Sequence, residues 1–128
     1  MILLDTSVLI DGLTGSKRSA RALRRAIEEG ERIVLCTLVL YEWLCGPRQP
    51  EEVAAQEALF PGGSAIGFGI EEAHIAAQLY QELRRKRGRE VDLAIAATAL
   101  CWDARLWTLN VEDFKDIPDL VVERPNRR

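Results

Sequence analysis

The chain has 128 residues, of which 48% are hydrophobic and 29% charged, and its formal net charge is −3. This length and composition predict one globular domain over residues 1–128 and exclude a disordered, fibrous or disulfide-dense protein. The negative net charge excludes a protein that coats nucleic acid through bulk positive charge, so any contact with nucleic acid must come from a local basic patch.

Cysteine usage and the first residues predict a cytoplasmic protein. The three cysteines, Cys36, Cys45 and Cys101, are odd in number and form no C-x-x-C pair, so we expect reduced thiols in a reducing compartment. No basic and apolar leader precedes the first apolar run, and no stretch has the length and apolar character of a membrane span. We therefore expect neither secretion nor a membrane partner.

Short apolar runs alternate with amphipathic segments in the first half of the chain. The first run stops at Asp5, Thr6 and Ser7, where a hydroxyl is placed to cap a helix. In chain order, we expect a strand over 2–4, helices from about 8 and over 19–29, a strand over 33–36, and helices over 38–44 and 50–60.

The second half continues this alternation, and the segment 91–102 is apolar almost all round, which is typical of a buried helix. In chain order, we expect a strand over 65–68, helices over 73–83 and 91–102, and strands over 105–109 and 120–122 with a helical turn near 112–114 between them. Such alternation indicates a parallel sheet covered on both faces. The expected fold class is α/β, a three-layer sandwich whose central, mainly parallel sheet has four to five short strands flanked by helices.

Three densely apolar segments, 2–10, 33–45 and 91–102, each contain a single charged residue. These residues are Asp5, Glu42 and Asp92, and all three are acids. A carboxylate in apolar surroundings must be paired with a cation, accept a proton or bind a metal, and none of the three segments contains a cation. Because the carboxyl ends of parallel strands open onto a common crevice, Asp5 belongs there, and Glu42 and Asp92 can reach it from helices.

The ligand types favour a hard divalent cation. The only histidine is His74, and the cysteines lack the spacing of a zinc site. Oxygen ligands favour Mg²⁺ or Mn²⁺, and carboxylate-held ions of this kind suit phosphodiester hydrolysis. Structural roles compete with this interpretation: Asp5 in a turn, Glu42 bonded to a free backbone amide, and Asp92 stabilised in the first turn of its helix.

Four strings in this order and spacing, LLDTSVLI, LYEWLCG, VDLAIAATAL and LWTLNVEDFKDIPDL, resemble the PIN domain family and, within it, the VapC-type toxins of toxin–antitoxin pairs. The resemblance covers nearly the whole chain. It implies a PIN-like fold, an endoribonuclease active on RNA, Mg²⁺ bound by Asp5, Glu42 and Asp92, a homodimer, and inhibition by a cognate VapB-like antitoxin whose tail covers the active cleft.

Family members place a fourth acid either at the position of Asn110 or at that of Asp113. Here Asn110 is neutral, so Asp113 is assigned to the metal site and Asn110 to a contact with the metal's surroundings. Asp113 also suits the first turn of a helix capped by Asn110. Thr6, Ser7 and Thr108 are assigned similar supporting parts.

A basic run precedes the helix of Asp92. It offers contacts with the phosphate backbone of RNA, although such runs are also common on solvated surfaces. Its candidate substrate-binding residues are Arg84, Arg85, Arg87 and Arg89.

Other functions remain alternatives to a toxin. A PIN-like nuclease can process RNA without an antitoxin, and a short antitoxin reading frame immediately upstream distinguishes the two. A non-enzymatic phospho-receiver module needs two adjacent acids after the first strand, and a phosphatase with an aspartyl nucleophile needs D-x-D. Residues 5–7 read Asp-Thr-Ser, which matches neither pattern.

Overall fold

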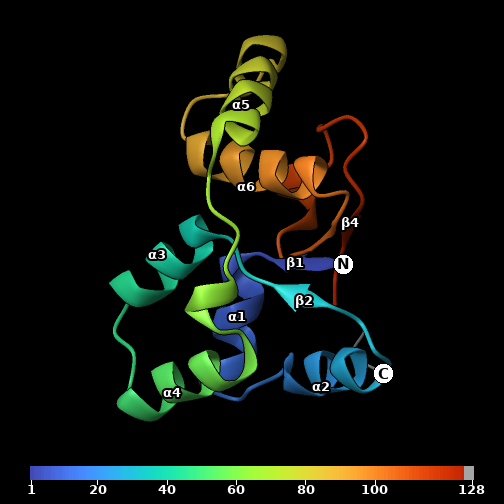
Figure 1. Ribbon diagram of the computed structural model, residues 1–128. Helices are drawn as coiled ribbons and strands as arrows, with labels where there is room; N and C mark the ends of the chain where they lie inside the picture. Colours follow the sequence, from blue (N-terminus) through green and yellow to red (C-terminus); the bar gives the residue numbers. More distant parts are fainter. Residues whose placement is uncertain (126–128) are drawn as a thin grey trace.

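The computed structural model describes residues 1–125 and contains one parallel sheet between helices (Figure 1). The strands are β1 (Ile2–Leu4), β2 (Ile33–Val34), β3 (Arg105–Trp107) and β4 (Val122–Glu123), in the order β2-β1-β3-β4. All three pairings are parallel, with Ile2 opposite both Ile33 and Arg105, and Leu106 opposite Val122. The predicted α/β class and parallel sheet are confirmed.

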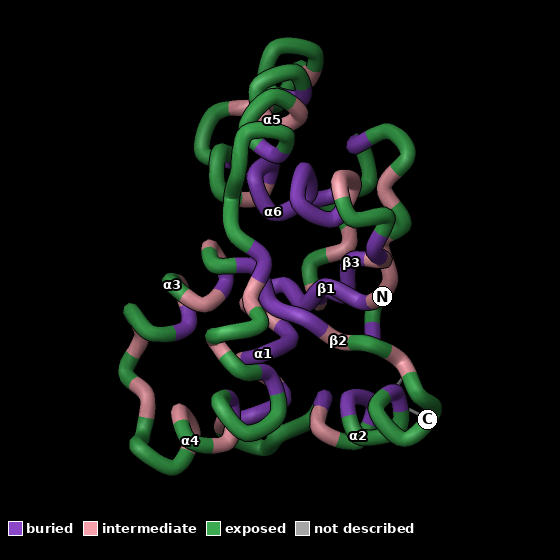
Figure 2. The backbone as a smooth tube through the Cα atoms, in the orientation of Figure 1, coloured by how far each residue is buried: buried purple, intermediate pink, exposed green. Residues whose placement is uncertain are grey.

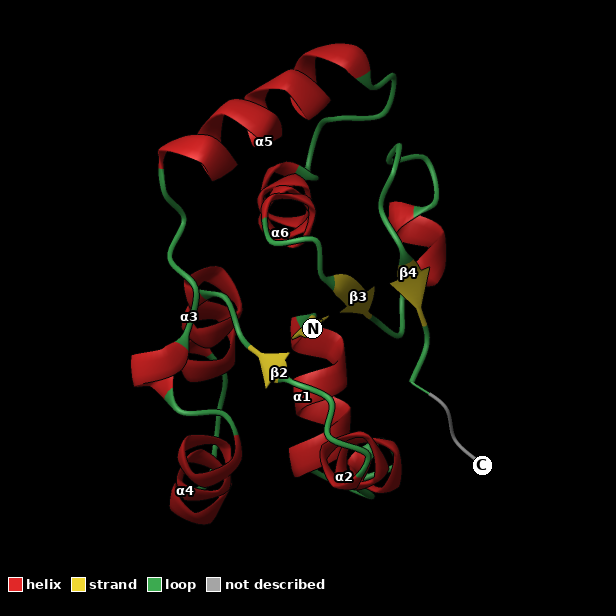
Figure 3. Ribbon diagram, turned by 45° about the vertical axis from the view of Figure 1, so that its right-hand side comes forward, coloured by secondary structure: helices red, strands yellow, loops and turns green. Residues whose placement is uncertain are grey.

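Within residues 1–125, six α-helices and two short 3-10 helices connect the strands. The helices are α1 (Thr6–Leu13), α2 (Ala20–Glu28), α3 (Thr37–Cys45), α4 (Pro50–Leu59), α5 (Ile70–Glu82) and α6 (Glu90–Cys101), and the 3-10 helices are η1 (Gly62–Ser64) and η2 (Val111–Phe114). Helices α5 and α6 lie on one side of the sheet, and α1 and α2 lie on the other (Figure 3). None of the helices within residues 1–125 combines the length and apolar character that crossing a membrane requires.

The core lies where the sheet meets α1 and α6. All three residues of β1 are fully buried, as are Val8, Leu9, Ile95 and Leu106. In α6, every residue from Leu93 to Ala99 is buried, which confirms the helix predicted to be apolar on all sides (Figure 2). Burial of these apolar side chains is the main stabilising term of the fold, and it fixes the ends of β1 and α6, where two candidate acids stand.

Some predicted boundaries were wrong. The strand expected over 65–68 is reduced to one isolated parallel bridge between Cys36 and Ile66, because Gly67 and Gly69 supply no side chains that would pack in a longer strand. The helix expected from 73 begins at Ile70, where Glu72 accepts a hydrogen bond from the Gly69 amide. The first helix begins at Thr6, with Asp5 itself at the N-cap.

Candidate active site

Asp5 lies where β1 ends and α1 begins, at the carboxyl edge of the sheet. Its backbone caps α1, since the amide of Val8 donates to the Asp5 carbonyl at 3.1 Å, but its side chain makes no capping hydrogen bond. The carboxylate, only 6% exposed, instead accepts hydrogen bonds at Oδ2 from Thr108 Oγ1 at 2.7 Å and Ser7 Oγ at 3.0 Å. The side chain is therefore held toward Thr108, at the carboxyl edge of the sheet.

The two hydroxyls that contact Asp5 are themselves oriented by backbone amides. Thr108 Oγ1 accepts from the amide of Asn110 at 3.0 Å, and Ser7 Oγ accepts from the amide of Leu109 at 3.1 Å. Because each oxygen already receives one proton, its own proton is free to point at Asp5. Ser7 and Thr108, which the sequence assigned supporting parts, thus contact Asp5, whereas Asn110 contributes its amide while its side chain stays exposed.

Glu42 joins the site from α3, whose neighbour is α1. Its Oε1 accepts a 2.6 Å hydrogen bond from Oγ1 of Thr6, the first residue of α1 and the neighbour of Asp5. The structure therefore brings Glu42 beside the end of β1, where it contacts the side chain of Thr6, the third residue assigned a supporting part. The competing role for Glu42, a bond to a free backbone amide, does not occur among residues 1–125.

Asp92 lies in the first turn of α6, where the negative charges of the other acids act on it. Burial, followed by the negative charges of Asp5, Asp113 and Glu42, raises the pKa of Asp92 from 3.8 to about 6, with Arg89 opposing the shift. The rise exceeds any favourable effect of the helix dipole on a carboxylate at this position. The other three candidate acids therefore all act electrostatically on Asp92.

These acids have no cationic partner within the described part of the chain. Its ion pairs involve Glu31, Glu112, Asp116 and Glu123, and none of the four candidate acids. Within residues 1–125, no group of three or more acidic, histidine or cysteine side chains is already arranged to hold a metal ion. Mutual repulsion of about 3 kcal/mol per carboxylate pair at 5 Å and a dielectric near 20 favours such separation. The all-oxygen donor set and the lack of ion-pair partners among residues 1–125 fit a hard divalent cation.

Asp113 stands on η2 and is exposed. The amide of Asp113 donates to the carbonyl of Asn110 at 2.9 Å, so Asn110 is at the N-cap and Asp113 in the first turn, as the structural alternative required. Asp113 nevertheless contributes to the raised pKa of Asp92. The structural and metal-binding interpretations are compatible, because Asp113 lies in the first turn of η2 and its charge still acts on Asp92.

The basic run forms the loop between α5 and α6. Tyr80, Lys86 and the four predicted arginines, Arg84, Arg85, Arg87 and Arg89, line a depression of about 680 Å³. Arg89 differs from the other three: it is 8% exposed, and its guanidinium already pairs with Asp116. A direct RNA contact by Arg89, as the sequence suggested, would require breaking this pair. Asp116 was not predicted, and nothing in the sequence marked it as the partner of a residue 27 positions away.

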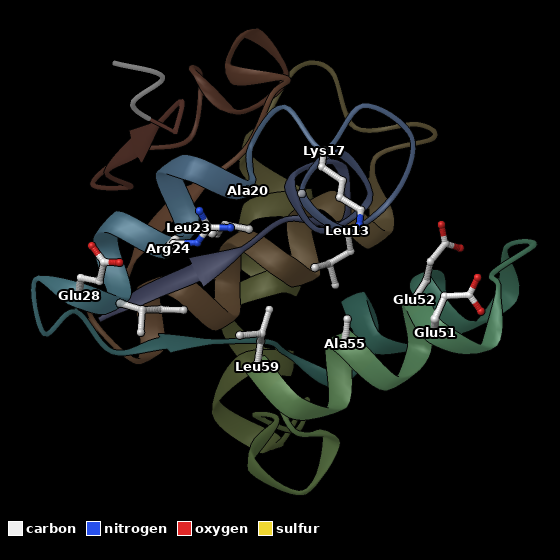
Figure 4. A pocket seen from close by; sticks show the side chains of 12 residues that line it. Leu13, Lys17, Ala20, Leu23, Arg24, Glu28, Glu51, Glu52, Ala55 and Leu59 are labelled. Atoms are coloured by element: carbon white, nitrogen blue, oxygen red, sulfur yellow. The ribbon is translucent and has the colours of Figure 1, made fainter.

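A second hollow, of about 430 Å³, lies between α2 and α4 and contains none of the four acids (Figure 4). Its apolar lining includes Leu13, Leu23 and Ala55, and Ile27 and Leu59 are exposed there at 42% and 48%. Glu28, Glu51 and Glu52 give its rim more acidic than basic residues, the latter being Lys17 and Arg24. The hollow is an apolar surface with an acidic border.

Comparisons with known proteins agree with this architecture. The family model of the PIN domain matches residues 2–120. Ribonuclease VapC19 of Mycobacterium tuberculosis is 39% identical over 125 residues, which cover 94% of this chain and 97% of that protein. PIN-domain ribonucleases of the VapC type depend on divalent metal.

Two solved structures share the fold. One is VapBC2 from Rickettsia felis, which is bound to a DNA fragment from its promoter. It superposes with a TM-score of 0.81 at 24% identity, covering 98% of this chain and 100% of that one. A toxin–antitoxin complex from Klebsiella pneumoniae superposes with a TM-score of 0.73 at 26% identity, covering 100% of both chains. The match over residues 2–120 and the 39% identity establish that this chain belongs to the PIN domain family, in the group named ribonuclease VapC.

Proposed function

We propose that this protein is a Mg²⁺- or Mn²⁺-dependent endoribonuclease that acts as the toxin of a toxin–antitoxin pair, with residues 1–128 forming one nuclease domain. The observation that carries the proposal is that burial, followed by the negative charges of Asp5, Asp113 and Glu42, raises the pKa of Asp92, while none of the four acids has an ion-pair partner among residues 1–125. Relatives named ribonuclease and a similar chain in a toxin–antitoxin complex support it.

The four acids would hold the metal, and the three hydroxyls would orient the acids. Ser7 and Thr108 fix one oxygen of Asp5, and Thr6 fixes one oxygen of Glu42. A bound divalent ion activates a water molecule and stabilises the leaving oxygen in phosphodiester hydrolysis. No histidine, serine or cysteine nucleophile is required.

The loop between α5 and α6 supplies the positive charge for the substrate. Arg84, Arg85 and Arg87, together with Lys86, face a depression directly before the helix of Asp92. Guanidinium groups bind phosphate oxygens through paired hydrogen bonds, so this loop suits the RNA backbone without reading its sequence. A contact between Arg89 and RNA would require breaking its bonds to Asp116, so Arg89 is left out of this proposed contact.

The apolar hollow between α2 and α4 suits a segment of the antitoxin. Ile27 and Leu59 expose apolar surface there, and Glu28, Glu51 and Glu52 border it. Charge complementarity favours an antitoxin segment with apolar side chains and flanking basic residues.

We also propose that the protein forms a homodimer. The exposed apolar residues Ile70, Tyr80 and Val91 support this proposal, and light scattering during size-exclusion chromatography tests it.

The three free cysteines favour a cytoplasmic location.

Cleavage of single-stranded RNA by the purified protein tests the nuclease. We expect cutting with Mg²⁺ or Mn²⁺, 5′-phosphate ends, and no cutting in excess chelator. Asp5→Asn should abolish cleavage, while the matched control Asp103→Asn, an exposed residue at the far end of α6, should not. Unchanged cutting in chelator would contradict the proposal. An antitoxin reading frame immediately upstream separates a toxin from an RNA-processing nuclease, the remaining alternative.

A further inference from the structure

Arg89 joins the two segments that carry Asp92 and Asp113. Its backbone stands at the N-cap of α6, where its carbonyl accepts from the amide of Leu93 at 2.8 Å, so Asp92 follows within the first turn. Its side chain crosses to η2, where Nη2 donates to the backbone carbonyl of Asp113 at 2.8 Å. One residue thus contacts both acidic segments.

The guanidinium of Arg89 is held by a two-point contact. Nη1 and Nη2 donate to the two carboxylate oxygens of Asp116 at 2.8 and 2.7 Å, and Nη1 also donates to the carbonyl of Arg85 at 2.6 Å. The planar fork of a guanidinium fixes its orientation against a carboxylate more closely than an ammonium group does. Because the side chain is also buried, Arg89 is a rigid link between the basic loop, η2 and α6.

We propose that Arg89 is a positioning residue of the nuclease: it fixes the backbone of Asp113 against the start of α6 and thereby sets the separation between the carboxylates of Asp113 and Asp92. This inference rests on the proposed function. It assigns Arg89 neither a contact with RNA nor a role as a simple counter-charge.

Metal affinity separates positioning from counter-charge, because the two roles predict opposite signs. If Arg89 acted only through its charge, removing that charge beside the acids would tighten cation binding. If Arg89 positions Asp113, losing the fork weakens binding, by about 10- to 100-fold as for other partners that orient metal-binding side chains. Lysine keeps the charge but lacks the fork, so it does not restore binding.

The first experiment measures the Mn²⁺ dissociation constant by calorimetry at pH 7.5 without RNA. We expect weaker binding in both Arg89→Met and Arg89→Lys than in the unmodified chain. Tighter binding in Arg89→Met with unchanged binding in Arg89→Lys would overturn the inference, and so would unchanged binding in both.

The second experiment is a double-mutant cycle on kcat that combines Arg89→Lys with Asp113→Asn. If Arg89 acts through Asp113, Arg89→Lys should change kcat by less than about twofold once Asp113 is already neutral, which is within the error of additivity. A loss as large in the Asp113→Asn background as in the unmodified chain would overturn the inference.

Asp116→Asn keeps the test decisive if the Arg89 variants fold poorly. The Asp116 side chain is 42% exposed, so the substitution removes the charge of the pair without emptying the core. We expect a native circular dichroism spectrum, weaker Mn²⁺ binding and lower kcat, and unchanged values of both would overturn the inference.

Mn²⁺ binding by the unmodified chain and by Asp92→Asn separates failure of the inference from failure of the proposed function. If the unmodified chain binds no Mn²⁺, or if Asp92→Asn does not abolish the binding, the proposed function fails and the inference fails with it. If Asp92→Asn abolishes the binding, the Arg89 variants test the inference alone.

Discussion

The hydroxyl of Thr108, just past β3, donates a 2.7 Å hydrogen bond to the carboxylate of Asp5, just past β1. The two residues are 103 positions apart in the chain, and they meet because β1 and β3 are parallel neighbours whose carboxyl ends share one edge. Both side chains are buried, so the bond fixes an acid that water would otherwise solvate.

Thr108→Val should reduce cleavage and stability together. The valine leaves the Asn110 amide without its acceptor and removes one donor from Asp5, at a cost of about 1–3 kcal/mol in the free energy of unfolding. We expect a fall in kcat of about tenfold, since Asp5 loses an orienting partner. Urea unfolding and single-turnover RNA cleavage measure the two effects.

Thr98→Val is the matched control for this experiment. Thr98 is fully buried and donates to the Ala94 carbonyl at 2.9 Å within α6, away from the hydroxyls that hold Asp5. Its loss should reduce stability without reducing kcat. Equal losses of kcat in both variants would show that general destabilisation, and not the bond to Asp5, accounts for the effect.

Asp92→Asn should stabilise the metal-free protein at neutral pH. With a folded-state pKa near 6 against an ordinary 3.8, folded Asp92 binds more protons than unfolded Asp92 between about pH 4 and 6. Its contribution to stability therefore falls as pH rises through this window, and the full loss is present above it. At pH 7.5 in chelator, we expect the variant to gain about 1 kcal/mol, a figure reduced for the solvent screening of a half-exposed group.

Urea unfolding at pH 4 and pH 7.5 measures this gain, which should nearly vanish at the lower pH. Added Mn²⁺ should reverse the order at pH 7.5, because only the unmodified chain gains the free energy of metal binding. Asp103→Asn, at an exposed residue just past the end of α6, is the matched control. An Asp92→Asn protein that is less stable than the unmodified chain in chelator at pH 7.5 would contradict the repulsion among the acids.

Arg87→Ala should weaken RNA binding and reduce its dependence on salt. Each lost phosphate contact lowers the slope of log affinity against log salt concentration by about 0.7 for a single strand. Binding is measured in chelator, so that the RNA stays intact. The matched control is Arg21→Ala, an exposed arginine on α2 outside the basic loop. Equal salt slopes in the two variants would contradict a role for the loop.

Leu59→Glu should prevent antitoxin binding while leaving RNA cleavage intact. The substitution places a charge on the apolar lining of the hollow between α2 and α4, where burial under a partner would carry a cost of several kcal/mol. Co-purification with a co-expressed VapB-like antitoxin measures the effect. Val121→Glu, an exposed apolar residue outside the hollow, is the control, and retained antitoxin binding by Leu59→Glu would place the antitoxin elsewhere.

The parallel sheet could be predicted from the sequence, and the candidate acids could be singled out in it, because both follow from local patterns. Asp5, Glu42 and Asp92 stand out as single charges within apolar runs, and burial imposes that contrast on the sequence itself. The supporting roles of Thr6, Ser7 and Thr108 could be suggested because these residues follow the ends of two apolar runs that form strands.

Contacts between distant exposed segments could not be predicted in this way. The bond from Arg89 to Asp116 joins two polar residues in polar stretches, where no hydrophobic period fixes their direction. The single bridge at Ile66 could not be distinguished from a strand, because the apolar residues around Gly67 fit either a bridge or a longer pairing. Local patterns report burial, whereas these features depend on tertiary contacts.

Anomalous diffraction from crystals soaked in Mn²⁺ tests the central claim most directly. We expect a peak between Asp5, Glu42, Asp92 and Asp113, with at least two carboxylate oxygens about 2.0–2.2 Å from it. The same soak of Asp92→Asn crystals should give a much weaker peak. A strong Mn²⁺ peak remote from these acids, or none at all at millimolar Mn²⁺, would contradict a metal-dependent nuclease site at this edge of the sheet.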